Sequence, residues 1–87
     1  MARLPVSIRC EDGREEFAIT ENVSKSGLCC PAHMELQVGD HVFIRLMSDE
    51  GPGEAEFRAQ VMWLRKLNEK RGILYGMKLD RDLTRAT

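Results

Sequence analysis

The residues of this chain that are best suited to hold a ligand lie in one short polar stretch, residues 22–27, which reads Asn-Val-Ser-Lys-Ser-Gly. Asn22 and Ser24 are two positions apart, so in an extended or turning segment both project to one side while Val23 points to the core. An asparagine amide and a serine hydroxyl together offer hydrogen-bond donors and acceptors. Gly27 permits a positive φ, which lets the backbone approach a ligand closely. The same residues would also form an ordinary Asx turn, and physics alone favours that structural interpretation.

Three cysteines and two histidines are the other residues with metal-binding or catalytic chemistry. Cys29 and Cys30 are adjacent, so they point to opposite faces of an extended strand, and neither forms a Cys-x-x-Cys pair with Cys10. We therefore expect reduced thiols that act as small buried apolar side chains, and surface or turn positions for His33 and His41. Neither histidine has a nucleophile partner at an informative spacing, and no glycine-rich phosphate loop precedes a helix. The sequence predicts no catalytic residue, no metal site and no cofactor.

Alternation of apolar and polar residues predicts that strands, rather than helices, position the polar stretch. We expect an all-β fold, a small antiparallel barrel or sandwich of six strands. These strands lie within residues 6–10, 17–20, 28–30, 42–47, 55–67 and 73–79. Pro31 should stop the third strand, because a proline has no amide hydrogen for a central ladder. Gly51-Pro52-Gly53 should form a loop over residues 48–54, and residues 80–87 a short C-terminal tail.

The longest expected strand carries the one tryptophan of the chain. Phe57, Ala59, Val61 and Trp63 occupy alternate positions, and we predict that all four side chains face the core. The second half of this strand is apolar on both faces. Tyr75 is expected to be half-buried with its hydroxyl in water. An alternative, in which Trp63 and Tyr75 stack on single-stranded nucleic acid, is less favoured because the first half of the chain is acidic and aromatic residues are few.

Composition limits the kind of protein further. With 87 residues, of which 43% are hydrophobic and 31% charged, the chain has material for one domain, residues 1–87, with one core. It has no long uncharged apolar run, so we expect no membrane insertion. The formal net charge of −1 provides no basic field for a DNA or RNA partner. Reduced thiols and the lack of a signal-like N-terminus predict a cytoplasmic location.

The order of short motifs along the chain resembles that of the PilZ domain family. The pattern Asn-x-Ser-x-x-Gly at residues 22–27 follows a hairpin that opens with Leu4-Pro5-Val6. The resemblance extends from about Leu4 to Leu79, and the combination of motifs is more specific than the six-residue pattern alone. Further matches to the framework of that family are Val38-Gly39-Asp40, Val61-Met62-Trp63 and Tyr75-Gly76-Met77-Lys78-Leu79.

This resemblance implies a six-stranded antiparallel β-barrel that acts as a receptor for the bacterial second messenger cyclic di-GMP. In that family, residues at the positions of Asn22, Ser24 and Gly27 hold one guanine of the ligand. A second family motif, Arg-x-x-x-Arg, lies just before the first strand, where its guanidinium groups bind phosphates and stack on guanine. Here the segment before Leu4 holds a single arginine, Arg3, which can supply one such guanidinium.

Arg81 and Arg85 have the spacing of the arginine motif, but they follow the last expected strand, so we interpret both as charge on the tail. The predicted ligand-binding residues are Arg3, Asn22, Ser24 and Gly27.

The expected function is therefore non-enzymatic regulation in the bacterial cytoplasm through binding of cyclic di-GMP. Because a charged partner of the phosphates is missing, we expect weaker binding than at a two-arginine site. The alternative is a degenerate PilZ-like adaptor that binds no nucleotide and contacts a protein partner in motility, surface attachment or polysaccharide export.

Overall fold

The computed structural model describes residues 3–81, which form one antiparallel sheet of seven strands. The order of the strands in the sheet is β2-β1-β5-β6-β7-β4-β3. Within the described residues there is no helix, and hence none that could span a membrane. The predicted all-β fold class is confirmed. The strands are β1 (Pro5–Cys10), β2 (Glu15–Ile19), β3 (Asn22–Val23), β4 (Gly27–Ala32), β5 (His41–Ser48), β6 (Gly51–Lys66) and β7 (Ile73–Leu79).

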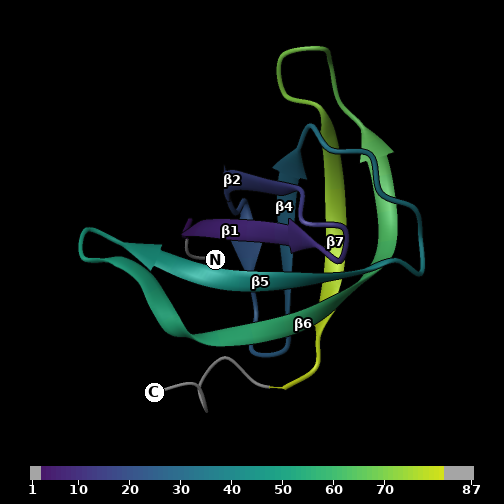
Figure 1. The fold of residues 1–87 in the computed structure, drawn as a ribbon. Helices are drawn as coiled ribbons and strands as arrows, with labels where there is room; N and C mark the ends of the chain where they lie inside the picture. Colours follow the sequence, from purple (N-terminus) through teal and green to yellow (C-terminus); the bar gives the residue numbers. More distant parts are fainter. Residues whose placement is uncertain (1–2, 82–87) are drawn as a thin grey trace.

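The sheet is strongly coiled, and its strands fall into two crossed groups (Figure 1). β1, β2 and β5 run across the direction of β4 and β7, and the long strand β6 passes from the first group to the second. The pairing register follows the same division, because β6 pairs with β5 over residues 51–60 and with β7 over residues 59–66. Coiling of this kind brings the inner faces of the two groups toward each other, so that they enclose one core.

The sheet forms a half-barrel, and the closed six-stranded barrel expected from the sequence is not confirmed. Among residues 3–81, no ladder joins the edge strands β2 and β3. The carboxylate of Glu16 in β2 bridges the open side instead, since it accepts hydrogen bonds from the backbone amides of His33 and Met34 at 2.7 and 2.8 Å. The seventh strand is the two-residue β3, which lies in the polar stretch where no strand was predicted.

The predicted end of β4 at Pro31 is wrong, because the strand continues to Ala32. β3 pairs only with Leu28 and Cys29 of β4, so Pro31 has β7 on one side and an open edge on the other. A proline nitrogen is tolerated at an open edge, since no ladder needs its missing hydrogen there. The prediction failed because it assumed a central strand at this point.

The loop predicted over residues 48–54 is also wrong. Residues 51–53 begin β6, and Pro52 pairs with Met47 of β5. Gly51 has a φ of 105°, which a glycine adopts without steric cost. The chain therefore reverses tightly between β5 and β6, and the Gly-Pro-Gly segment belongs to the strand.

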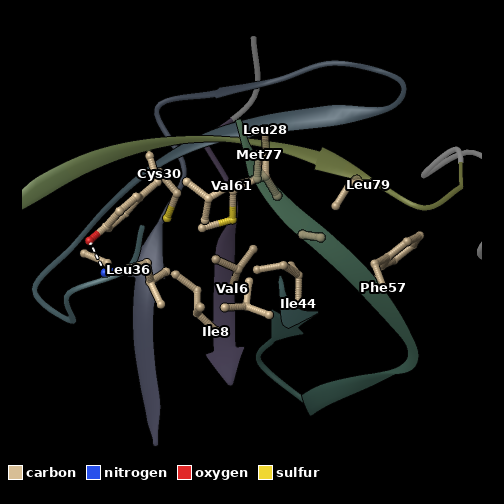
Figure 2. Packing of buried hydrophobic residues seen from close by; sticks show 14 of the residues in the cluster. Val6, Ile8, Leu28, Cys30, Leu36, Ile44, Phe57, Val61, Met77 and Leu79 are labelled. Atoms are coloured by element: carbon tan, nitrogen blue, oxygen red, sulfur yellow. Dashed lines mark hydrogen bonds between the residues drawn. The ribbon is translucent and has the colours of Figure 1, made fainter. Parts of the chain in front are cut away.

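The core lies between the two groups of strands (Figure 2). Cys10 and Cys30 are buried in the same cluster as free thiols, as predicted for cysteines that act as small apolar side chains. The largest aliphatic and aromatic side chains with no exposed area are Val6, Ile8, Val42, Ile44, Phe57, Val61 and Tyr75.

Tyr75 was predicted to be half-buried with a solvated hydroxyl, and this prediction is wrong because the residue has no exposed area. Its hydroxyl donates a hydrogen bond to the carbonyl of Met34 at 2.7 Å and accepts one from the amide of Leu36 at 2.8 Å. The dashed line at Leu36 in Figure 2 marks the second of these bonds. The connection between β4 and β5 thus supplies both hydrogen-bond partners of the hydroxyl, in place of water, and these bonds attach it to β7.

Trp63 was predicted to lie in the core, but 46% of its surface is exposed. The three predicted core residues that precede it in β6 are all fully buried. A β-bulge separates them from Trp63: Val61 pairs with Met77, whereas Trp63 pairs with Gly76, the residue immediately before Met77. Because one extra residue in β6 reverses the alternation of faces, Trp63 lies on the outer face of the sheet.

Candidate ligand-binding site

The polar stretch folds into a short β-hairpin at one edge of the sheet, in which both residues of β3 pair with β4. The amide of Ser24 donates a hydrogen bond to the carbonyl of Gly27 at 2.9 Å, which closes the turn. Asn22 and Ser24 are exposed, whereas Val23 packs against the core, as the two-residue spacing predicted. The hairpin therefore presents a serine and an asparagine on the outer face.

The hydroxyl of Ser24 is oriented by its own turn. Its Oγ lies 3.3 Å from the carbonyl oxygen of Gly27, to which it donates. Because the hydroxyl proton is directed toward the protein, the lone pairs of Oγ can accept a hydrogen bond from a ligand. The amide of Asn22, two positions away, contains both a donor and an acceptor group. This combination matches the edge of a purine base, which carries both kinds of group.

The backbone of Gly27 does not adopt the positive φ that a glycine permits. The residues with positive φ are Gly13, Gly39, Gly51 and Gly72, so Gly27 does not need the left-handed region. A Cβ at position 27 would lie 2.9 Å from the carbonyl oxygen of Met77 in β7. Glycine is therefore required because β4 and β7 approach closely, and a side chain would push the two strands apart.

Trp63 lies over Gly76 on the outer face of β7. A Cβ at position 76 would lie 2.1 Å from Cε2 of the indole, so the ring occupies the space that a side chain would need. Gly76 is buried for this reason, although it lies on the outer face. Met62 and Leu64, on either side of Trp63, are also exposed.

These elements surround a shallow hollow of about 230 Å³. Asn22, Ser24 and Gly27 line one part of it, and Met62 and Trp63 line another. Pockets that enclose whole drug-sized ligands measure about 300–1,000 Å³. The hollow is smaller than that, and it combines polar groups with an aromatic ring, so it suits one planar base whose remaining parts lie outside.

Arg3 is not among the residues that line the hollow. It is exposed just before β1, next to Leu4, which exchanges hydrogen bonds of 2.8 and 2.9 Å with Thr20. Thr20 lies two residues before Asn22, so Arg3 stands near the point where the chain enters the hairpin. The structure thus brings Asn22, Ser24 and Gly27 together. It places Arg3, the fourth predicted site residue, near the start of the hairpin.

Arg81 packs on β6 rather than serving only as tail charge. Its guanidinium carbon lies 4.7 Å from the centroid of the Phe57 ring, and its Nη2 donates a hydrogen bond to the carbonyl of Glu56 at 2.9 Å. The guanidinium is thereby held away from the hollow. Residues 82–87 of the predicted tail, Arg85 among them, lie outside the described residues.

Cys29 and Cys30 point to opposite faces of β4, as adjacent residues of a strand must. Cys29 lines the hollow, and its pKa is raised by burial and by the nearby carboxylate of Glu21. Burial in the core raises the pKa of Cys30 to about 12. Both thiols are therefore protonated at neutral pH, and neither is an activated nucleophile.

Neither histidine lines the hollow. The ring of His33 contacts the carboxylate of Glu16 at 3.3 Å and the carbonyl of Lys70 at 2.8 Å. Within residues 3–81, no cluster of three or more His, Cys, Asp or Glu side chains is arranged to hold a metal ion.

Trp63 is the residue of the hollow that sequence reasoning placed wrongly. The available signal was Met62-Trp63-Leu64, which follows the apolar Val61 directly and so makes four consecutive apolar residues after a segment of regular alternation. Such a run contradicts continued alternation and is compatible with a bulge. Alternation alone does not show which of the three faces outward, because that depends on the pairing with β7.

Comparison with known proteins gives one match, to a family model. The model of the PilZ domain matches residues 2–87 of the chain. No curated protein and no solved structure matches it.

Proposed function

This chain belongs to the PilZ domain family, and from that premise we propose that it is a non-enzymatic regulatory domain that binds cyclic di-GMP. Domains of this family are generally receptors for that dinucleotide. The observation that carries the proposal is the hollow, in which Asn22, Ser24 and Gly27 meet the exposed ring of Trp63. Polar groups that hydrogen-bond to a base edge and a ring that stacks on a base face are the usual elements of base recognition.

In the proposed complex, one guanine enters the hollow. Ser24 Oγ accepts a hydrogen bond from the base edge, and the amide of Asn22 makes a second polar contact. The indole of Trp63 stacks on the base, a contact that contributes about 1–3 kcal/mol in single-stranded nucleic-acid complexes. Gly27 keeps the hairpin close to β7, so that the polar groups and the ring face the same space.

Arg3 is proposed to contact a phosphate of the same ligand. It is exposed and stands near the base of the hairpin, where a guanidinium can reach a group that projects from the hollow. A charge-assisted contact of this kind is stronger than a neutral hydrogen bond. One such arginine should hold the ligand less tightly than two.

The wider proposal treats residues 1–87 as one domain that works in the bacterial cytoplasm. Binding would be read out by a protein partner in motility or polysaccharide export, and neither DNA nor RNA is proposed as a partner. The thiols near the site are protonated and the hollow contains no histidine, so its described residues offer no activated nucleophile or base.

A calorimetric titration with cyclic di-GMP tests the proposal, with Ser24→Ala as the site variant and Ser26→Ala as the matched control. Ser26 lies in the same turn, is exposed and is not among the residues that line the hollow. We expect the unmodified chain to bind with a Kd of roughly tens of micromolar or weaker. Ser24→Ala should weaken binding about fivefold, the effect of one hydrogen bond, and Ser26→Ala should leave it unchanged.

Absence of binding at millimolar ligand, with the fold intact, would overturn the receptor proposal and favour the adaptor. One observation supports that second candidate: Phe17 and Ile19 of the edge strand β2 are 65% and 54% exposed. Large apolar side chains on an unpaired edge are typical of surfaces that contact another protein.

A further inference from the structure

Next to the hollow, the outer face of the sheet carries a groove lined by His41, Arg58, Gln60, Lys78 and Asp80, which we call the basic groove. It runs along a row of paired residues that crosses four strands. Gly27 of β4 pairs with Lys78 of β7, Lys78 pairs with Gln60 of β6, and Gln60 pairs with His41 of β5. Gly27 thus belongs both to the hollow and to the row that forms the groove.

Lys78 and the exposed indole of Trp63 lie on the same face of the sheet. Gly76, which the indole covers, and Lys78 are alternate residues of β7, so their outward directions coincide. Two positions along a strand span about 7 Å, at about 3.4 Å per residue. This separation is comparable to the span of one nucleotide from its base to its phosphate.

The basic groove has uncompensated positive charge. Within residues 3–81, neither Arg58 nor Lys78 forms an ion pair, and both side chains are exposed. Asp80 is the one carboxylate that lines the groove, and its Oδ1 accepts a hydrogen bond from the backbone amide of Arg58 at 3.2 Å. Two cations thus face one carboxylate.

Several other arginines do have a carboxylate partner. Arg9 and Arg45 share Glu56, at 3.0 and 3.3 Å, and Arg71 pairs with Glu21. Arg58 and Lys78 instead line the basic groove without such a partner among residues 3–81.

We propose that the basic groove holds a phosphodiester of the ligand whose base occupies the hollow, with Lys78 and Arg58 as the cations that bind it. This inference rests on the proposed function and names cations that the resemblance does not assign. A guanidinium offers paired donors to two phosphate oxygens, and an ammonium adds a compact positive charge. The groove supplies both kinds of group from adjacent strands.

The test is a titration with cyclic di-GMP over a range of salt concentrations, from about 0.05 to 0.5 M, across which screening of exposed charges increases strongly. The variants are Lys78→Gln and Arg58→Gln. The matched control is Lys70→Gln, because Lys70 is exposed in the turn before β7, at the opposite end of that strand from Lys78. Circular dichroism and a denaturant melt check that each variant is folded.

We expect Lys78→Gln and Arg58→Gln each to weaken binding about tenfold at low salt, the effect of one charge-assisted contact. Each should also make the affinity less dependent on salt. Ser24→Ala should weaken binding while leaving the salt dependence as it is in the unmodified chain, because its contact is neutral. Lys70→Gln should change neither quantity.

The outcomes separate this inference from the function on which it rests. If the unmodified chain binds and Ser24→Ala weakens binding, but Lys78→Gln and Arg58→Gln behave like Lys70→Gln, the groove proposal alone is overturned. If the unmodified chain does not bind at millimolar ligand, both proposals fail.

Discussion

The second half of β6 is more apolar than the first, yet its large apolar side chains are the more exposed. Residues 51–60 pair with β5, and within them Phe57 and Ala59 have no exposed area. Beyond Val61 the strand pairs with β7 alone. The three apolar residues that follow are exposed to 50%, 46% and 37%: Met62, Trp63 and Leu64.

The difference shows that the face on which a side chain lies, rather than the composition of its strand, decides whether it enters the core. The first half pairs with β5 and places Phe57 and Ala59 on the inner face. The second half pairs with β7, and the bulge after Val61 turns Trp63 outward. One strand therefore supplies residues of the core as well as the exposed indole of the candidate site.

Phe57→Ala should have the largest effect on stability, and a small effect would contradict the difference between the two halves of β6. Removal of a fully buried ring from the first half of β6 should lower the free energy of unfolding by about 3–5 kcal/mol. Urea denaturation followed by circular dichroism measures this loss. Phe17→Ala is the control of the same residue type, and because Phe17 is 65% exposed it should cost about 0.5 kcal/mol or less. Equal losses in the two variants would contradict the assignment of the core.

Tyr75→Phe tests the strand that supports the second half, since Tyr75 pairs with Leu64. Loss of the hydroxyl leaves the amide of Leu36 without its acceptor in a buried position. An unsatisfied buried donor costs about 1–3 kcal/mol. Equilibrium unfolding measures the difference, and an unchanged free energy would mean that water replaces the hydroxyl.

Trp63→Ala should separate stability from binding. Because nearly half of the side chain is exposed, its removal should cost about 1 kcal/mol or less in a denaturant melt. The same variant should bind cyclic di-GMP at least about fivefold more weakly, as expected for a lost stacking contact. A loss of stability as large as that of Phe57→Ala would show that both halves of β6 are equally buried.

His33→Gln should have the smallest effect on stability. The ring of His33 contacts Lys70, in the turn that follows the second half of β6. The His33 pKa is raised from 6.5, first by the hydrogen bond to the carbonyl of Lys70 and then by the carboxylate of Glu16. A raised pKa in the folded state stabilises the protein below the unfolded pKa, and this contribution is lost as the pH rises through the folded value.

The free energy of unfolding should therefore fall between about pH 6 and pH 8, the range in which histidine titrates. His33→Gln should lack this step. If the two proteins have the same pH profile over that range, the contact with the β6–β7 turn contributes nothing to stability.

Much of the fold follows from local patterns. Alternation predicted the class of the fold, the cores of β1, β5 and β7, and the buried residues of the first half of β6. The spacing of Asn22, Val23 and Ser24 predicted which side chains face outward. These properties depend on the two-residue period of a strand, which the order of residues expresses directly.

The failures have a common physical origin in pairing between distant segments. The exposure of Trp63 depends on a shift of register against β7, and the continuation of β4 past Pro31 depends on the shortness of β3. The role of Gly27 depends on its approach to Met77. Each of these is a contact between segments far apart in the chain, so a local pattern does not contain it.

The adjacent cysteines of β4 give the molecule two built-in reporters. Cys29 lies at the hollow, so a thiol reagent can reach it in the folded protein, and a ligand seated there should slow its reaction. Cys30 faces the core with a pKa of about 12, so it reacts only when β4 leaves the sheet. The rates of labelling at two consecutive positions would therefore measure occupancy of the site and the opening of β4 independently.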